Sequence, residues 1–206
     1  MIIRDGQIRK EVEAVPCVYL IESSNATVLS RTIRLFSNYP FNHLSISLDE
    51  SLSEVYSFGR KQPNNPLIGG FVQEDFQHPF YTNTEVRVYA LEMTKSEWAA
   101  LCRYLEIFKN DPSVWRYNFL GLIPAYFNIS WTREHHYFCS QFVATLFKEV
   151  NLAPSMLRPE CAHPKDVIEA LQPLLVYEGR LWDYAKLSDN KPLVSDFLEE
   201  ESIFIK

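Results

Sequence analysis

Strict alternation of apolar and polar residues marks two strands in this chain, and no other feature limits the fold as strongly. Over residues 43–48, HLSISL, each Leu or Ile follows a His or a Ser, which is the period of a strand with one buried face. Residues 84–93 alternate in the same way and place Val86, Val88 and Ala90 on one side. Such strands must bury their apolar faces, so we expect a sheet covered by helices.

Helix signals lie between the strands. Thr94 and Glu97 form a capping box, and apolar residues at helical spacing follow it through residue 110. Further helices are expected after an Asn25 cap and over 139–150. The other expected elements are a strand over 16–22, a strand over 54–58 that forms a hairpin with 43–48, a loop over 60–70, a helix over 164–173, a hairpin over 174–185 and an acidic tail over 196–206. Without repeats or a linker, these elements indicate one α+β domain over 1–206.

Composition and charge exclude several partners. Hydrophobic residues make up 47% and charged residues 22%, as in ordinary globular proteins. The net charge of −6 and the absence of a Lys/Arg-rich run argue against nucleic acid and against an anionic membrane surface. No window approaches the roughly 18 apolar residues of a membrane span, and the start of the chain lacks a signal-peptide core. We therefore expect a cytoplasmic protein without a transmembrane segment.

Four cysteines are present, and neither Cys102 nor Cys161 is expected to have a chemical role. No C-x-x-C pair occurs, so thiols are expected in a reducing compartment. Cys161 and His163 would need two more ligands to hold zinc, and Cys102 falls on the apolar stripe of the helix that follows Thr94. Neither a metal nor another cofactor is expected.

Cys139 differs from the other cysteines because it opens a helix, in HHYFCSQFV. The free N–H groups and the positive dipole end of a first turn stabilise a thiolate, which makes a nucleophile at neutral pH. A buried structural cysteine fits the same position equally well.

A thiol nucleophile needs a base, and His43 is the candidate that a strand holds in place. It lies on the polar face of the strand with Ser45 and Ser47. An exposed or capping histidine is the competing interpretation. His135 and His136 are nearer in sequence, but an extended approach to the helix favours surface positions for them.

The order of these segments resembles a known family. A His on a strand (FNHLSISLDE), its hairpin partner (EVYSFGRK) and a later Cys at a helix start (YFCSQFVATLF) are similar to the circularly permuted NlpC-type cysteine hydrolases of the papain-like fold. The stretches YSFGRK and NPLIGGF resemble a bacterial subgroup of unknown substrate, and the resemblance covers about residues 14–185. It implies a permuted papain-like fold with a central antiparallel sheet packed against helices.

The resemblance also implies roles for individual residues. Cys139 would be the nucleophile and His43 the general base. The third residue would be Ser57 on the partner strand, with Glu54 as the alternative, because a carboxylate orients an imidazole better than a hydroxyl does. Tyr137 or the backbone N–H of Cys139 would help to stabilise an oxyanion. Gln141 is expected to point away.

These roles predict an acyl-transfer hydrolase that works through a thioacyl-enzyme. The acyl substrate could be a small molecule, a peptide or cell-wall-type amide, or a lipid ester or amide. Two other classes remain open: a non-catalytic binding module on the same scaffold, which a weak third residue would favour, and a redox-sensing thiol protein. The sequence does not determine the oligomeric state.

Overall fold

The computed structural model describes residues 15–24, 39–62 and 65–188. The helix predicted after Asn25 and the acidic tail predicted over 196–206 lie outside these ranges. The described part contains one large sheet and five α-helices, so the predicted α+β class is confirmed. Among the described helices, none combines the length and apolar character that crossing a bilayer requires.

The sheet has eight strands in the order β7-β6-β4-β3-β2-β1-β5-β8. Its neighbours pair antiparallel, except for the parallel pair β6 and β7. The strands are β1 (Cys17–Ser23), β2 (His43–Ser47), β3 (Val55–Gln62), β4 (Asn65–Glu74), β5 (Glu85–Glu92), β6 (Arg116–Tyr117), β7 (His136–Tyr137) and β8 (Leu174–Arg180).

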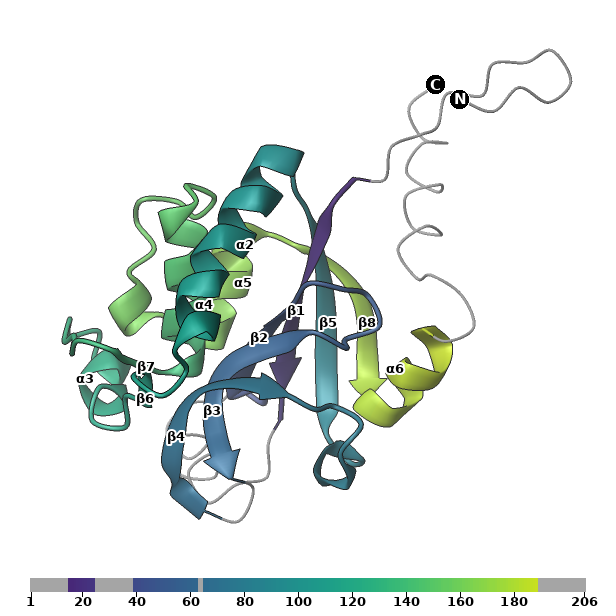
Figure 1. Ribbon diagram of the computed structural model, residues 1–206, viewed down its shortest axis with the longest axis horizontal. Coiled ribbons are helices and arrows are strands. Elements are labelled where there is room, and N and C mark those ends of the chain that lie inside the picture. The colour runs from purple at the N-terminus through teal and green to yellow at the C-terminus, as the bar shows by residue number, and fades with distance from the viewer. Residues whose placement is uncertain (1–14, 25–38, 63–64, 189–206) are drawn as a thin grey trace, which may run out of the picture.

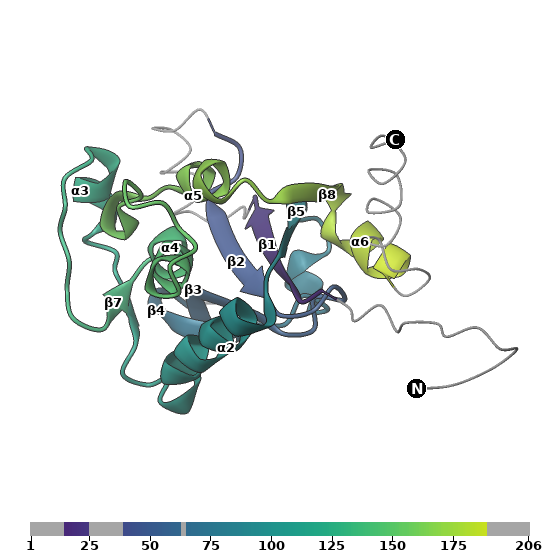
Figure 2. The ribbon, with the colours of Figure 1, turned by 90° about the horizontal axis from the view of Figure 1, so that it is seen from above.

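The helices are unevenly distributed about the sheet. Three of them, α2, α4 and α5, lie together on one side of it, whereas α6 lies beyond β8 (Figures 1 and 2). The helices are α2 (Lys95–Asn110), α3 (Leu122–Tyr126), α4 (Cys139–Glu149), α5 (Pro164–Leu171) and α6 (Leu181–Ser188), with 3-10 turns η1 (Pro79–Tyr81) and η2 (Pro159–Cys161). The capping box predicted at α2 is confirmed: the Thr94 N–H donates to Glu97 Oε2 at 2.7 Å and the Glu97 N–H to Thr94 Oγ1 at 3.3 Å.

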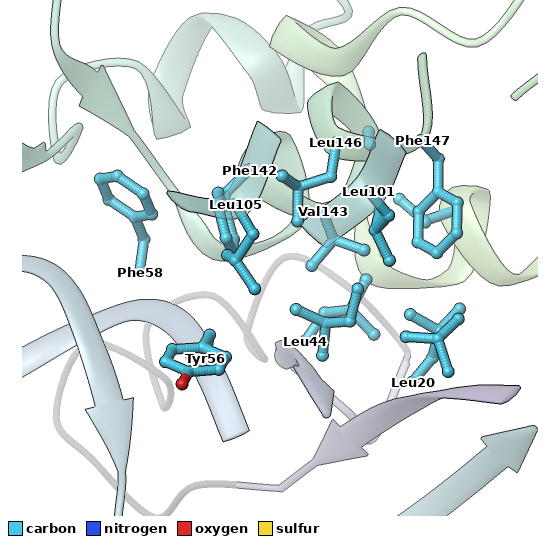
Figure 3. Packing of buried hydrophobic residues seen from close by; sticks show 14 of the residues in the cluster. Leu20, Leu44, Tyr56, Phe58, Leu101, Leu105, Phe142, Val143, Leu146 and Phe147 are labelled. Atoms are coloured by element: carbon cyan, nitrogen blue, oxygen red, sulfur yellow. The ribbon is translucent and has the colours of Figure 1, made fainter. Parts of the chain in front are cut away.

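A ring-rich core fills the space between the sheet and helices α2 and α4. Figure 3 shows side chains of both helices facing those of β1, β2 and β3. Phe142 of α4 is fully buried there, and its ring centroid lies 5.2 Å from that of Phe58 and 5.0 Å from that of Phe108. This packing fixes α4, and with it the cysteine at its first position, against the sheet.

Phe142→Ala should therefore lower the free energy of unfolding by about 3–5 kcal/mol, the usual cost of a buried Phe-to-Ala cavity. The matched control is Phe127→Ala, because the Phe127 side chain is 67% exposed. We expect the control to change stability by less than about 0.5 kcal/mol. Urea unfolding followed by circular dichroism measures both, and equal effects would contradict this description of the core.

The opposite face of the sheet has its own core, in which Val86, Val88 and Ala90 are buried side by side as predicted. Leu181 and Tyr184 of α6 complete it at 3% and 1% exposure. Their i, i+3 spacing is helical, so residues 181–188 form a helix. The predicted hairpin over 174–185 is therefore wrong: its first strand is β8, but the residues from 181 on belong to helix α6.

The loop predicted over 60–70 is also wrong. β3 runs to Gln62 and β4 starts at Asn65, with Gln62 paired to Asn65. Of the residues that suggested a loop, Asn65, Pro66, Gly69 and Gly70 lie in β4. The predicted hairpin between 43–48 and 54–58 is confirmed as β2 and β3.

Candidate active site

Cys139 is the first residue of α4, as predicted. The helix starts there because apolar anchors on its inner face, Val143 and Leu146, are fully buried against the sheet. Gln141, expected to point away, is instead buried, and its Oε1 accepts from the Phe138 N–H at 3.4 Å, so it caps the helix. The thiol is consequently held at the positive end of a well-anchored helix.

The tip of α4 reaches the sheet where β2 and β3 separate. Their ladder contains only the pairs Ile46–Tyr56 and Ser47–Val55. The Leu44 and Ser140 N–H groups donate to the Cys139 sulfur, which also lies 4.0 Å from the Asn42 carbonyl oxygen. Strand β2 and the first turn of α4 thus each provide one amide donor to the sulfur.

His43 and Cys139 are brought together, although nearly a hundred residues separate them. The two side chains interact, since each shifts the pKa of the other. The Nε2 atom of His43 lies 2.7 Å from Glu74 Oε1, so Nδ1 is the ring nitrogen left for the sulfur. Cysteine, histidine and carboxylate therefore form one continuous chain of contacts.

Glu74 is held by three neighbours on the same face of β2, β3 and β4. In addition to His43, Ser57 Oγ donates to its Oε1 at 2.7 Å and Ser45 Oγ to its Oε2 at 2.8 Å. With both oxygens bonded, Glu74 cannot rotate away from the imidazole.

The charges of this chain of contacts favour an ion pair. Burial alone would lower the pKa of His43, but the Glu74 charge and the bond to Cys139 outweigh it and raise that pKa well above its ordinary value. Burial alone would raise the pKa of Cys139, yet the hydrogen bond and charge of His43 and the two N–H donors lower it. The Glu74 pKa is lowered against its own burial by His43 and the two serines. All three directions favour the charged forms, thiolate, imidazolium and carboxylate, over the neutral ones.

A tyrosine that the sequence did not reveal completes the site. The half-buried Tyr117 of β6 hydrogen-bonds to Cys139, and burial, the thiolate charge and this bond together raise its pKa well above the ordinary value. A tyrosine that stays protonated is a donor to the sulfur. It stabilises the thiolate in the same way as the backbone amides do.

Tyr117→Phe should raise the pKa of Cys139 by about one unit, since hydrogen bonds to charged groups contribute about 1.5–3 kcal/mol. The control is Tyr137→Phe, in the neighbouring position of the parallel ladder. Tyr137 packs its ring on Phe58, Phe108 and Trp115, and we expect no shift from its hydroxyl. The pH dependence of iodoacetamide alkylation measures both, and a shift in the control alone would contradict the assignment.

Two predicted roles differ from the structure. The residue that bonds to His43 is Glu74, whereas Ser57 bonds to Glu74 and so acts one step away. Glu54, the predicted alternative, is exposed. Its backbone N–H donates to the Asp49 carboxylate, and it is Glu74, not Glu54, that contacts His43. Tyr137 packs its ring on Phe58, Phe108 and Trp115, and its part in stabilising an oxyanion stays a prediction. The tyrosine at the sulfur is Tyr117.

The remaining candidates are placed away from the sulfur. His135 is exposed and lies 3.4 Å from Glu134, and His136 Nδ1 contacts the Glu134 carbonyl at 2.6 Å. Within the described ranges, no group of three or more His, Cys, Asp or Glu side chains is arranged to hold a metal ion. Cys161 is buried with its pKa raised by burial, which fits a packing role.

Glu74 could have been found from the sequence, but Tyr117 could not. Had 65–74 been assigned as the hairpin partner of β3, the alternation in FVQE would have placed Glu74 on the face of Ser57. β6 and β7 are two residues long, too short for a periodic signal.

Comparisons with protein-family models, with curated proteins and with solved structures found no match to this chain. What the site does must therefore be argued from its own geometry.

Proposed function

We propose that this protein is a cysteine hydrolase or acyltransferase of the permuted papain-like type, with Cys139 as nucleophile, His43 as general base and acid, and Glu74 as the residue that orients His43. The single observation that carries the proposal is the contact chain from the Cys139 sulfur through His43 to a buried Glu74. A cysteine with a packing role alone needs neither the imidazole nor the carboxylate.

The proposed reaction has two steps. The Cys139 thiolate attacks an ester or amide carbonyl, and a thioester bond to Sγ forms as the bond to the leaving group breaks. The imidazolium of His43 gives its proton to the leaving group, and the neutral ring then takes a proton from the water or other acceptor that cleaves the thioester. Peptides, cell-wall fragments, small amides and lipid esters all remain within this class.

Two donors are positioned to stabilise the developing oxyanion. The Cys139 N–H belongs to the first turn of α4, where amides have no partner within the helix, and the Tyr117 hydroxyl hydrogen-bonds to the sulfur in the resting state. When the sulfur becomes bonded to carbon it loses its charge, and the hydroxyl is then available to the adjacent oxygen.

Incubation with p-nitrophenyl acetate followed by intact-protein mass spectrometry tests the proposal. We expect one acetyl adduct, located on Cys139 and released by hydroxylamine. The control is Cys102→Ala, since burial raises the pKa of Cys102, and it should retain the adduct, whereas Cys139→Ala should lose it. A reactive Cys139 that never carries an acyl group would contradict acyl transfer and favour a redox role.

A further inference from the structure

A long uncharged segment starts at the site tyrosine. Residues 117–132, YNFLGLIPAYFNISWT, contain no Asp, Glu, Lys, Arg or His. Four of its apolar side chains are largely exposed: Leu120 at 60%, Ile123 at 66%, Phe127 at 67% and Ile129 at 57%. We call these four residues the α3 surface. Single exposed apolar residues are ordinary, but a cluster of this kind indicates a binding surface.

The α3 surface is located at an extremity of the molecule. Helix α3 lies at the opposite end from α6 in both views (Figures 1 and 2). Its side chains project from a short helix and the turn that follows. An apolar tip that projects in this way can insert into a lipid bilayer without contact from the rest of the protein.

Several backbone N–H groups of this tip are bonded within the segment. The N–H groups of Gly121, Ala125, Phe127, Asn128 and Ile129 all donate to acceptors within the segment, at 2.9–3.1 Å. Burial in hydrocarbon requires such internal bonding because no water is present to solvate a free amide. A loop that stays in water has no such requirement.

Amphipathic and charged groups border the α3 surface. Tyr126 and Trp131 are 43% and 38% exposed, and aromatic rings with a polar edge favour the boundary of a bilayer. Exposed arginines lie at both ends of the uncharged segment: Arg116 before it, and Arg133 after it, with its guanidinium 5.9 Å from the Trp131 ring centroid. Arginine side chains can reach phosphates while their stems stay apolar.

We propose that the α3 surface docks this protein on a zwitterionic phospholipid bilayer. Neutral lipid is favoured over anionic lipid because Glu134 directly follows Arg133 and the chain as a whole carries −6. Lipid is favoured over a protein partner because the segment offers no charge across sixteen residues to set orientation or specificity. The proposal does not depend on the chemistry of Cys139.

Flotation with phosphatidylcholine vesicles tests the docking, using the full chain with Cys139→Ala so that no turnover intervenes. We expect this protein to float with vesicles, also at 0.5 M salt, because apolar insertion is not screened. Adding Ile123→Ser and Phe127→Ser should reduce the bound fraction per lipid by about tenfold or more, given the apolar area withdrawn from lipid.

The control adds Trp182→Ser and Leu187→Ser instead, which removes two apolar side chains of 51% and 47% exposure on α6. It should float like the parent protein. In a second measurement, vesicles should shift the tryptophan emission to the blue, and Trp131→Phe should remove most of that shift.

Four results would overturn the proposal. The parent protein could fail to float, or the control could lose binding as strongly as the α3 variant. Binding could require anionic lipid and disappear with salt. Sedimentation could also show a dimer that the α3 changes dissociate while vesicles bind nothing, and the surface would then be an interface between copies. None of these outcomes affects acyl-enzyme formation at Cys139, which p-nitrophenyl acetate measures separately.

Discussion

His43→Ala should reduce the alkylation rate of Cys139 at pH 7 by about 30-fold or more. His43 supplies the charge and the side-chain hydrogen bond that lower the Cys139 pKa against its burial. Without them, the thiol returns to at least an ordinary pKa, at which only about 3% is ionised at pH 7. Turnover should fall further, because the base and acid are lost as well.

The matched control is His136→Ala, since His136 lies in the approach to the same helix but contacts the Glu134 carbonyl. We expect its alkylation rate to remain within about twofold of wild type, because a surface change of this kind leaves the site intact. If the control lost reactivity and His43→Ala did not, the base would have to be reassigned to the histidines beside Cys139.

Glu74→Gln should have the second large effect, because it should lower both the alkylation rate of Cys139 and the free energy of unfolding. The amide keeps the shape of Glu74 but removes the charge that raises the His43 pKa. Less imidazolium means less thiolate, so alkylation at pH 7 should fall by about tenfold. Breaking a buried ion pair on one side should also cost about 3 kcal/mol of unfolding free energy.

The pH dependence of that stability loss follows from the directions of the two shifts. The Glu74 pKa is lowered from 4.5, so its contribution is present above 4.5 and disappears as the pH falls through the lower folded value. The His43 pKa is raised from 6.5, so its contribution is present below 6.5 and disappears as the pH rises through the higher folded value. The stability difference from wild type should therefore be largest between pH 4.5 and 6.5, measured by urea unfolding.

Glu54→Gln serves as the control for this carboxylate, because Glu54 is exposed. It should change stability by less than about 0.5 kcal/mol and leave the reactivity of Cys139 unaltered. Equal effects of the two substitutions would show that overall charge, rather than the bond to His43, explains the loss.

Local patterns predicted much of the fold and half of the candidate site. The alternation over 43–48 located β2, and the placement of Cys139 in a first turn followed from the helical spacing behind it. The alternation did not predict, however, that the polar face of β2 is buried. His43 and Ser45 are buried rather than solvated, because Glu74 supplies their hydrogen bonds from a strand two places away in the sheet.

Long-range pairing explains why Glu74 was missed and why Tyr117 could not be predicted. Ser57 had the right face of β3 for the third residue, but the side chain that contacts the imidazole is Glu74 of β4, to which Ser57 also donates. Tyr117 reaches the sulfur because β6 pairs with β4 on one side and β7 on the other. Neither pairing has a local signature, since both depend on which segments meet at the edge of the sheet.

The thiolate itself can be observed by its absorbance near 240 nm, as the difference between wild type and Cys139→Ala across pH 5–10. The other three cysteines contribute little at neutral pH: burial raises the pKa of Cys17 to about 11 and also raises those of Cys102 and Cys161. We predict one full thiolate at pH 7, which His43→Ala abolishes. A difference signal that emerges only near pH 9, as for an ordinary thiol, would contradict an ion pair between Cys139 and His43.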